Sequence, residues 1–143
     1  METLRQLLGG EPRAPITVRP DDTVFHALEL MARHDIGALL VMDGERLVGI
    51  FTERDYARKV VLHGQSSRQL IVREVMTDKV CYALAHQTVP EAMALITEKR
   101  VRHLPVLDDR QKVLGIVSIG DLVKSTISDQ AFIIQQLEHY ITT

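Results

Sequence analysis

The chain reads Gly115-Ile116-Val117-Ser118-Ile119-Gly120-Asp121-Leu122 in its second half, and a near-copy in its first half reads Gly49-Ile50-Phe51-Thr52-Glu53-Arg54-Asp55-Tyr56. In each copy an apolar run ends at a hydroxyl residue, and an aspartate follows three positions later. The apolar run predicts a strand, and the aspartate begins a helix-like pattern. Each copy therefore places one hydroxyl and one carboxylate at the carboxyl end of a strand, which is where ligands bind in open α/β layers.

The duplication extends to the residues before these stretches. A shift of 65 positions pairs Thr23 with Thr88, and beyond a turn, where an insertion costs little, a shift of 66 pairs Gly49 with Gly115. The spacing of apolar residues in each copy predicts the order β-α-β-β-α. Each copy is about 60 residues long, which is marginal for independent stability, so we expect the two repeats to bury a shared face.

This organisation predicts four segments along the chain. A first repeat with an N-terminal helix occupies residues 1–64, a polar linker residues 65–71, a second repeat residues 72–128, and a helical tail residues 129–143. The duplication does not account for the tail. Its apolar stripe at helical spacing either packs on the domain or meets a partner, and consists of Ile133, Ile134, Leu137 and Ile141.

Composition excludes several classes of protein. Apolar residues make up 45% and charged residues 25% of the 143 residues, which is ordinary for a soluble globular chain. The net charge of −2 argues against a general attraction to nucleic acid or acidic membranes. The single cysteine, Cys81, excludes an internal disulfide and a structural zinc site, so a reducing cytoplasm is the expected compartment. No apolar run approaches the roughly 18 residues that span a bilayer, so neither secretion nor membrane insertion is expected.

The two motifs resemble a known family. The pattern of strand, hairpin and Gly-x-x-[Ser/Thr]-x-x-Asp is written twice, His103-Leu104-Pro105-Val106-Leu107-Asp108 precedes the second copy, and Met76-Thr77 opens the second repeat. Together they resemble a tandem of cystathionine-β-synthase (CBS) domains, called a Bateman module. The resemblance implies an α/β fold of the α+β type, with two pseudo-symmetric repeats packed through their sheets. It also implies homodimers, and clefts between the repeats that bind adenosine-containing ligands such as AMP, ADP, ATP, NAD or S-adenosylmethionine.

By this resemblance the motif aspartates, Asp55 and Asp121, bind the two ribose hydroxyls of the ligand. Thr52 and Ser118 would reach the ribose or a phosphate. The chemistry is suitable, because an ionised carboxylate accepts two hydrogen bonds from a vicinal diol. The alternative is that a hydroxyl three residues before an acid at a helix start is a capping pattern that needs no ligand.

Phosphates require cations near the same cleft. The resemblance assigns this role to Arg102 and His103, whose counterparts in the first repeat are the uncharged Gly37 and Ala38, so the two clefts cannot be equivalent. It also assigns a role to Arg54, which could serve the cleft of the other repeat. The alternative for both arginines is a solvated surface charge.

The adenine ring is expected between apolar side chains, next to backbone groups of the first extended piece of each repeat. By resemblance these residues are Ile16, Thr17, Ile50, Cys81, Tyr82 and Ile116. Each of them could equally be ordinary core. No His or Lys close in sequence would lower the pKa of the Cys81 thiol, so it fits a small buried residue better than a reactive one.

The function that follows is regulatory ligand binding, with a signal passed to a partner protein that has yet to be identified. No nucleophile and base arrangement, phosphate-binding loop or dinucleotide glycine pattern is present, and the histidines show no metal-ligand spacing, so we expect neither an enzyme nor a metal site. The main alternative is a constitutive dimerisation or scaffold module. Nucleic-acid binding is disfavoured, because the chain is acidic overall and lacks an aromatic platform.

Overall fold

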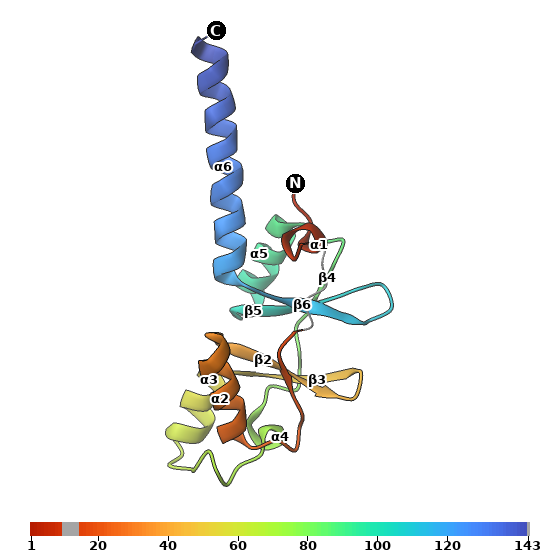
Figure 1. Cartoon of the computed structure of the whole chain (residues 1–143), viewed down its shortest axis with the longest axis vertical. Helices are drawn as coiled ribbons and strands as arrows, with labels where there is room; N and C mark the ends of the chain where they lie inside the picture. The colour runs from red at the N-terminus through yellow and green to blue at the C-terminus, as the bar shows by residue number, and fades with distance from the viewer. Residues whose placement is uncertain (10–14, 143) are drawn as a thin grey trace. The chain divides into compact units, whose positions relative to one another are not determined.

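A computed structural model of the chain describes residues 1–9 and 15–142 (Figure 1). These residues form two compact units. The first-repeat unit comprises residues 15–81 and 111–113, and the second-repeat unit comprises residues 1–9, 82–110 and 114–142.

The first-repeat unit contains a three-stranded sheet in the order β1-β2-β3. Strand β1 pairs parallel with β2, and β2 pairs antiparallel with β3 across a turn in which Gly44 has a φ of 63°. A tight hairpin turn requires positive φ, which glycine adopts without steric cost. The elements are β1 (Thr17–Val18), α2 (Val24–His34), β2 (Ala38–Asp43), β3 (Arg46–Thr52), α3 (Glu53–Asp55), η1 (Tyr56–Val61) and α4 (Val72–Val75).

The second-repeat unit repeats this architecture. Its sheet has the order β4-β5-β6, with β4 parallel to β5, and the cartoon shows β5 and β6 as a hairpin (Figure 1). The mixed α/β fold with two similar three-stranded sheets, predicted from the duplication, is therefore confirmed within the described residues. The elements are α1 (Leu4–Leu7), β4 (Ala83–Leu84), α5 (Val89–Lys99), β5 (His103–Leu107), β6 (Val113–Ser118) and α6 (Ile119–Thr142).

Matching residues in the two repeats begin and end matching helices. The Thr23 hydroxyl accepts a hydrogen bond from the His26 amide at 3.0 Å, and the Thr88 hydroxyl accepts one from the Glu91 amide at 3.3 Å. Such caps satisfy amides that have no partner in the first turn. The matched residues Thr23 and Thr88 thus set the starts of α2 and α5.

The short helices α1 and α4 each pack with a repeat other than the one they directly precede in the sequence. Helix α4 stands before the second repeat in sequence but lies in the first-repeat unit, where Val72 and Val75 belong to the core. Helix α1 stands before the first repeat but lies in the second-repeat unit, where Leu4 is fully buried. This arrangement differs from the predicted division, which placed residues 1–64 in one repeat.

Equivalent backbone hydrogen bonds hold these two helices. In the first-repeat unit the amide of Val72 donates to the carbonyl of Asp22 at 2.8 Å, and the amide of Val24 donates to that of Leu70 at 2.9 Å. In the second-repeat unit Leu4 donates to Gln87 at 2.9 Å, and Val89 donates to Glu2 at 3.0 Å. The duplication therefore includes the short helix, and each copy of it completes the other repeat.

The two motif glycines lie where these helices approach the sheets. A Cβ atom on Gly49 would meet the sulfur of Met76 at 2.5 Å, and one on Gly115 would meet Leu8 at 3.1 Å. At Gly49 the Thr77 carbonyl oxygen also lies 3.1 Å from that position, so a side chain would force both Met76 and Thr77 to move, whereas at Gly115 only the Leu8 side chain would have to shift.

The last helix of each repeat differs from the prediction in detail. The residues after Asp55 form a π-helix, in which the amide of Leu62 donates to the carbonyl of Ala57 at 3.1 Å. The tail predicted from residue 129 onward continues α6 without a break to Thr142. The hydroxyls of Thr126 and Ser128 donate to carbonyls four residues earlier, both at 3.0 Å, so these residues are accommodated within the helix.

We expect Leu4→Ala to destabilise the protein by about 2–5 kcal/mol, because it removes a fully buried side chain of a helix that completes the second-repeat unit. Arg5→Ala is the matched control, since Arg5 is the next residue and is exposed, and it should change stability by less than about 0.5 kcal/mol. Urea unfolding followed by circular dichroism measures both. Equal stability of the Leu4→Ala variant and the unmodified chain would contradict the placement of α1.

Candidate functional site

The two motif aspartates stand at matching junctions between a strand and a helix. At the end of β3 the amide of Thr52 donates to Asp55 Oδ2 at 3.0 Å, and the Asp55 amide donates to Thr52 Oγ1 at 3.1 Å. At the end of β6 the amide of Ser118 donates to Asp121 Oδ2 at 2.9 Å, and the Asp121 amide donates to Ser118 Oγ at 3.1 Å. The capping role weighed for these residues is therefore present in both repeats. It engages one carboxylate oxygen of each aspartate.

The second carboxylate oxygen of Asp55 is also engaged. Asp55 Oδ1 accepts a hydrogen bond from Thr77 Oγ1 at 3.0 Å and forms an ion pair with Lys59 Nζ at 3.1 Å. Thr52 Oγ1 contacts Oδ2 at 3.1 Å, and Lys59 Nζ also donates to the Met76 carbonyl at 3.3 Å. Asp55 is only 6% exposed. Its carboxylate thus has four polar contacts inside its own unit and little access to solvent.

Asp121 is in a different situation. Its side chain is exposed, and within the described part of the chain its Oδ1 atom has no hydrogen-bond or ion-pair partner. A carboxylate oxygen in this position can accept hydrogen bonds from a ligand without giving up an internal contact. Of the two motif aspartates, Asp121 is therefore the one whose carboxylate is available.

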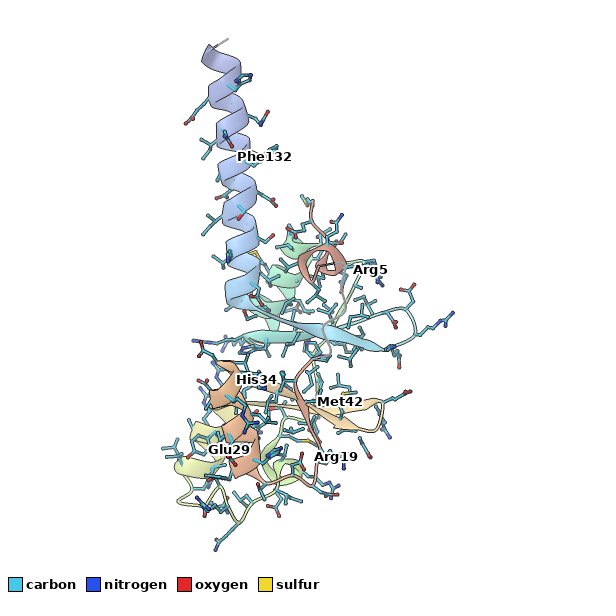
Figure 2. All side chains as sticks on the ribbon, in the orientation of Figure 1. Arg5, Arg19, Glu29, His34, Met42 and Phe132 are labelled. Carbon is cyan, nitrogen blue, oxygen red and sulfur yellow. The ribbon has the colours of Figure 1, made fainter. Side chains whose placement is uncertain are left out.

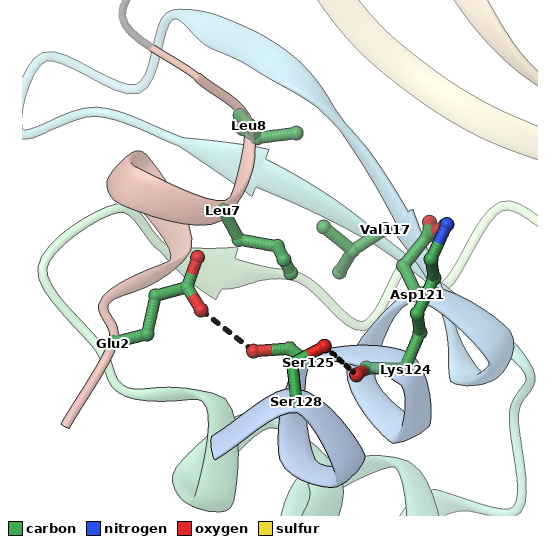
Figure 3. A pocket seen from close by; sticks show the side chains of 8 residues that line it. All are labelled: Glu2, Leu7, Leu8, Val117, Asp121, Lys124, Ser125 and Ser128. Carbon is green, nitrogen blue, oxygen red and sulfur yellow. Dashed lines mark hydrogen bonds between the residues drawn. The ribbon is translucent and has the colours of Figure 1, made fainter. Parts of the chain in front are cut away.

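Asp121 also lies on the wall of a pocket of about 470 Å³ in the second-repeat unit (Figure 3). Ser125 Oγ, which is almost fully buried, donates to Glu2 Oε2 at 2.7 Å across this pocket. Lys124 lies one turn after Asp121 on the same helix face. The lining residues are Glu2, Leu7, Leu8, Val117, Asp121, Lys124, Ser125 and Ser128.

Sequence reasoning missed four of the polar residues in this pocket, Glu2, Lys124, Ser125 and Ser128. The last three could have been found, because they stand three, four and seven positions after Asp121 on a predicted helix. Glu2 could not have been found in this way, since its approach to α6 depends on the packing of α1 on the second-repeat unit. The pocket lies on the Val117 side of β6, whereas Ile116 faces the other side, because neighbouring residues of a strand alternate.

The predicted phosphate-binding residues divide between the units. Arg102 has an exposed side chain in the second-repeat unit, and its carbonyl accepts a hydrogen bond from the Ile119 amide at 2.9 Å. This bond ties the residue before β5 to the start of α6, next to Ser118. The half-buried His103 is the first residue of β5. Arg54 is exposed in α3 of the first-repeat unit, so its predicted service to Asp121 stays a prediction.

The predicted adenine-binding residues are also divided. Ile50 is buried in β3, and its amide and carbonyl both pair with Thr77 at 2.9 Å, so its backbone edge is already occupied. Tyr82 is 44% exposed. The other side chains range from half-buried to exposed. The first-repeat unit holds Ile16, Thr17, Ile50 and Cys81, and the second-repeat unit holds Tyr82 and Ile116.

Among the described residues, no three His, Cys, Asp or Glu side chains are grouped so that they could hold a metal ion. None of the described helices combines the length and the apolar character needed to cross a membrane.

Solved structures of similar proteins share this fold. A protein with CBS domains from Burkholderia ambifaria MC40-6, described as a candidate for signal transduction, is 53% identical, with a TM-score of 0.84 over 90% of this chain and 96% of that one. The CBS domain pair of protein MJ0100 is 25% identical, with a TM-score of 0.79 over 90% of this chain and 98% of that one. That pair was crystallised with 5′-methylthioadenosine and S-adenosyl-L-methionine.

Sequence comparison leads to the same family. A mitochondrial CBS domain-containing protein of Arabidopsis thaliana, CBSX3, is 40% identical over 126 residues, which is 85% of this chain and 61% of the plant protein. The chain spans about three fifths of the length of the first curated relatives it matches. The model of the CBS domain family matches residues 12–62 and again residues 72–128. The chain therefore belongs to the CBS domain family and carries two CBS domains in tandem.

Proposed function

We propose that this CBS pair is a regulatory module that binds an adenosine-containing ligand through Asp121 and passes its ligand state to a partner protein. The observation that carries the proposal is the difference between the two motif carboxylates. Asp55 is buried and engaged by Thr52, Thr77 and Lys59, while Asp121 is exposed with one open oxygen. The adenosyl ligands crystallised with the CBS pair of MJ0100 support the ligand class.

The chemistry at Asp121 suits a ribose. A vicinal diol donates two hydrogen bonds, and a carboxylate with an open oxygen accepts them strongly because it is charged. Ser118 holds the other carboxylate oxygen through its amide and so orients the group. The ligand then requires no rearrangement of the cap, since the bonds between Ser118 and Asp121 persist when it binds.

Charge decides which side of β6 the phosphates occupy. The pocket on the Val117 side contains the Glu2 carboxylate beside Lys124, so a phosphate placed there would face both signs of charge. The exposed Arg102 stands just before β5, and its carbonyl accepts the Ile119 amide at the start of α6, so its guanidinium brings positive charge close to the end of β6. The predicted side, with Ile116 against the base and Arg102 near the phosphates, is therefore our proposal. Positive charge favours AMP, ADP, ATP or NAD over the cationic S-adenosylmethionine.

One ligand per chain follows from the same contacts. A ribose at Asp55 would have to displace the Thr77 hydroxyl or the Lys59 ammonium, and leaving either group without a partner costs free energy. Asp121 carries no such penalty. We propose that the first-repeat unit is held by its internal ion pair, and that the second-repeat unit carries the ligand.

Signalling would act through a shift of populations. A ligand shifts an equilibrium only by its difference in affinity for two states, so the partner must bind the liganded and unliganded forms differently. We propose a homodimer in the cytoplasm as the acting form. The second candidate function, a constitutive dimerisation or scaffold module, is favoured by the exposed apolar residues of α6.

We expect AMP, ATP or NAD to raise the melting temperature by several degrees at a hundredfold excess over Kd, because binding to the folded state alone adds about 2.7 kcal/mol. GMP and CMP should raise it less.

Asp121→Asn should weaken nucleotide binding more than about tenfold, since it removes a charged acceptor, while retaining capping ability. Isothermal titration should give one site per chain. If no nucleotide up to millimolar concentration moves the melt, and none co-purifies, the scaffold function replaces this proposal.

The role of Arg102 is tested with a pair of ligands. Arg102→Ala should weaken AMP binding about tenfold and leave adenosine binding unchanged, because only AMP presents a phosphate to the guanidinium. Arg110→Ala is the matched control, an exposed arginine on the connection between β5 and β6. Titration calorimetry with both ligands measures the difference. Equal losses for AMP and adenosine would show that Arg102 does not contact the phosphate.

The two aspartates should also differ in their contribution to stability. Asp55→Ala removes the partner of Lys59 and Thr77 in a buried position, and should lower the free energy of unfolding by about 2–4 kcal/mol. Asp121→Ala removes an exposed cap and should lower it by about 1 kcal/mol. Denaturant unfolding without nucleotide measures both values. A larger loss at Asp121 would contradict the assignment of Asp55 as the structural member of the pair.

A further inference from the structure

The second half of α6 lies outside the packed part of its unit. Every described side chain from Ile127 to His139 is exposed, and these include large apolar ones (Figure 2, where Phe132 is labelled). Within the described residues, no other element of the chain covers this portion. The exposed fractions are 59% for Ile127, 61% for Phe132, 55% for Ile133, 55% for Ile134 and 57% for Leu137. A short helix with so much exposed apolar surface is marginal alone in water, so it needs a partner surface.

The apolar residues of α6 follow a heptad pattern. Apolar side chains recur at alternating steps of four and three, which is the a and d spacing of a coiled coil. The a positions hold isoleucine, and the d positions hold valine, glutamine and leucine. In order along the helix, this seam consists of Val123, Ile127, Gln130, Ile134 and Leu137. The sequence continues the spacing to Ile141, whose side chain lies outside the described residues.

The seam does not face the unit to which α6 belongs. Leu122 and Ser125 are the buried residues near the start of the helix, and they fix the face that packs on the second-repeat unit. At 3.6 residues per turn the seam lies about a third of a turn away from that face. Val123, at its start, is still 40% exposed. A helix from another molecule can therefore pack along the seam without displacing the contacts between α6 and its own second-repeat unit.

The charges of α6 fit an uncharged partner. From Ser125 to Thr142 the sequence contains no Lys or Arg and two acidic residues, Asp129 and Glu138, and neither lies in the seam. An acidic or basic partner groove would find no complementary charge there. A second copy of the same helix presents the same neutral seam and is complementary to it.

We propose that α6 pairs with α6 of a second copy of this chain as a parallel two-stranded coiled coil through the seam. In parallel coiled coils, isoleucine at a with leucine at d favours two strands. Parallel in-register pairing also places Gln130 opposite its own copy, where the two amides can hydrogen-bond, whereas antiparallel packing would place it against Ile134. Such a contact is isologous, as a twofold dimer requires. The inference rests on the proposed homodimer, and adds to it the surface and the direction of pairing.

The size of the seam determines how strong the dimer can be. Four described apolar side chains per copy, which are 40–59% exposed, leave roughly 50 Å² each to cover, or roughly 400 Å² for the pair. Stable interfaces bury about 1,200–2,000 Å² in total. The coiled coil alone therefore supports a reversible dimer that dissociates in the micromolar range, and any contact between the folded units would tighten it.

The seam is tested by substitutions on opposite faces of α6 in the full chain. Ile134→Gln with Leu137→Gln should raise the dimer dissociation constant at least tenfold in sedimentation equilibrium. Phe132→Gln, which removes an equally exposed apolar side chain on the face opposite the seam, should leave it unchanged. Gln130→Leu should lower it. Equal weakening by Phe132→Gln and the double variant, or no weakening by the double variant, would overturn the proposal.

Direction is tested by a cysteine in the seam. In a Cys81→Ser background, Leu137→Cys should form an intermolecular disulfide, because equivalent d positions adjoin in a parallel pair. Antiparallel packing of a against d would place Leu137 opposite Ile127, with the two residues 137 about 15 Å apart, and no disulfide would form. The absence of the disulfide overturns parallel pairing. A monomeric wild type at all concentrations overturns both the seam and the homodimer, whereas nucleotide melting tests the ligand site independently.

Discussion

The junction between a strand and the helix that follows it is the constraint on which both repeats depend. At each junction a hydroxyl residue and an aspartate exchange two hydrogen bonds, between Thr52 and Asp55 and between Ser118 and Asp121. The exchange satisfies amides that the first helical turn cannot, and it holds a carboxylate at the end of a strand. In the proposed function, helix capping and ligand binding therefore use the same kind of side chain. What surrounds the second carboxylate oxygen determines which role remains open.

The two junctions differ in the partners of the second carboxylate oxygen. Asp55 has acquired Lys59 one turn later and Thr77 from the segment that closes the edge of β3. Asp121 has Lys124 on the same helix face, and both residues line a pocket that also includes Glu2. Among the described residues, the Oδ1 atom of Asp121 has no partner. An internal ammonium and hydroxyl satisfy the first carboxylate, as a ligand would satisfy the second. The pair thus combines one carboxylate that is satisfied internally with one that, in the proposed function, a ligand satisfies.

The exchange of short helices explains why the two repeats form one protein. Each repeat lacks part of its core, which a helix from elsewhere in the chain supplies: α4 provides Val72 and Val75, and α1 provides Leu4. The glycines at positions 49 and 115 allow the segments that carry or follow these helices to lie against the sheets. Neither helix is long enough to be stable alone, so both depend on this packing.

The sequence by itself determined the duplication, with Thr23 matched to Thr88, the order of strands and helices, and the family, because these depend on local spacing that repeats along the chain. It also identified Asp55 and Asp121, but it could not separate them, since both stand in the same local motif. Only the tertiary structure decided that Thr77, 22 residues away, saturates Asp55, that α1 brings Glu2 beside α6, and that the seam of α6 faces away from its own unit. Those facts depend on contacts between residues distant in the chain, and local spacing carries no information about such contacts.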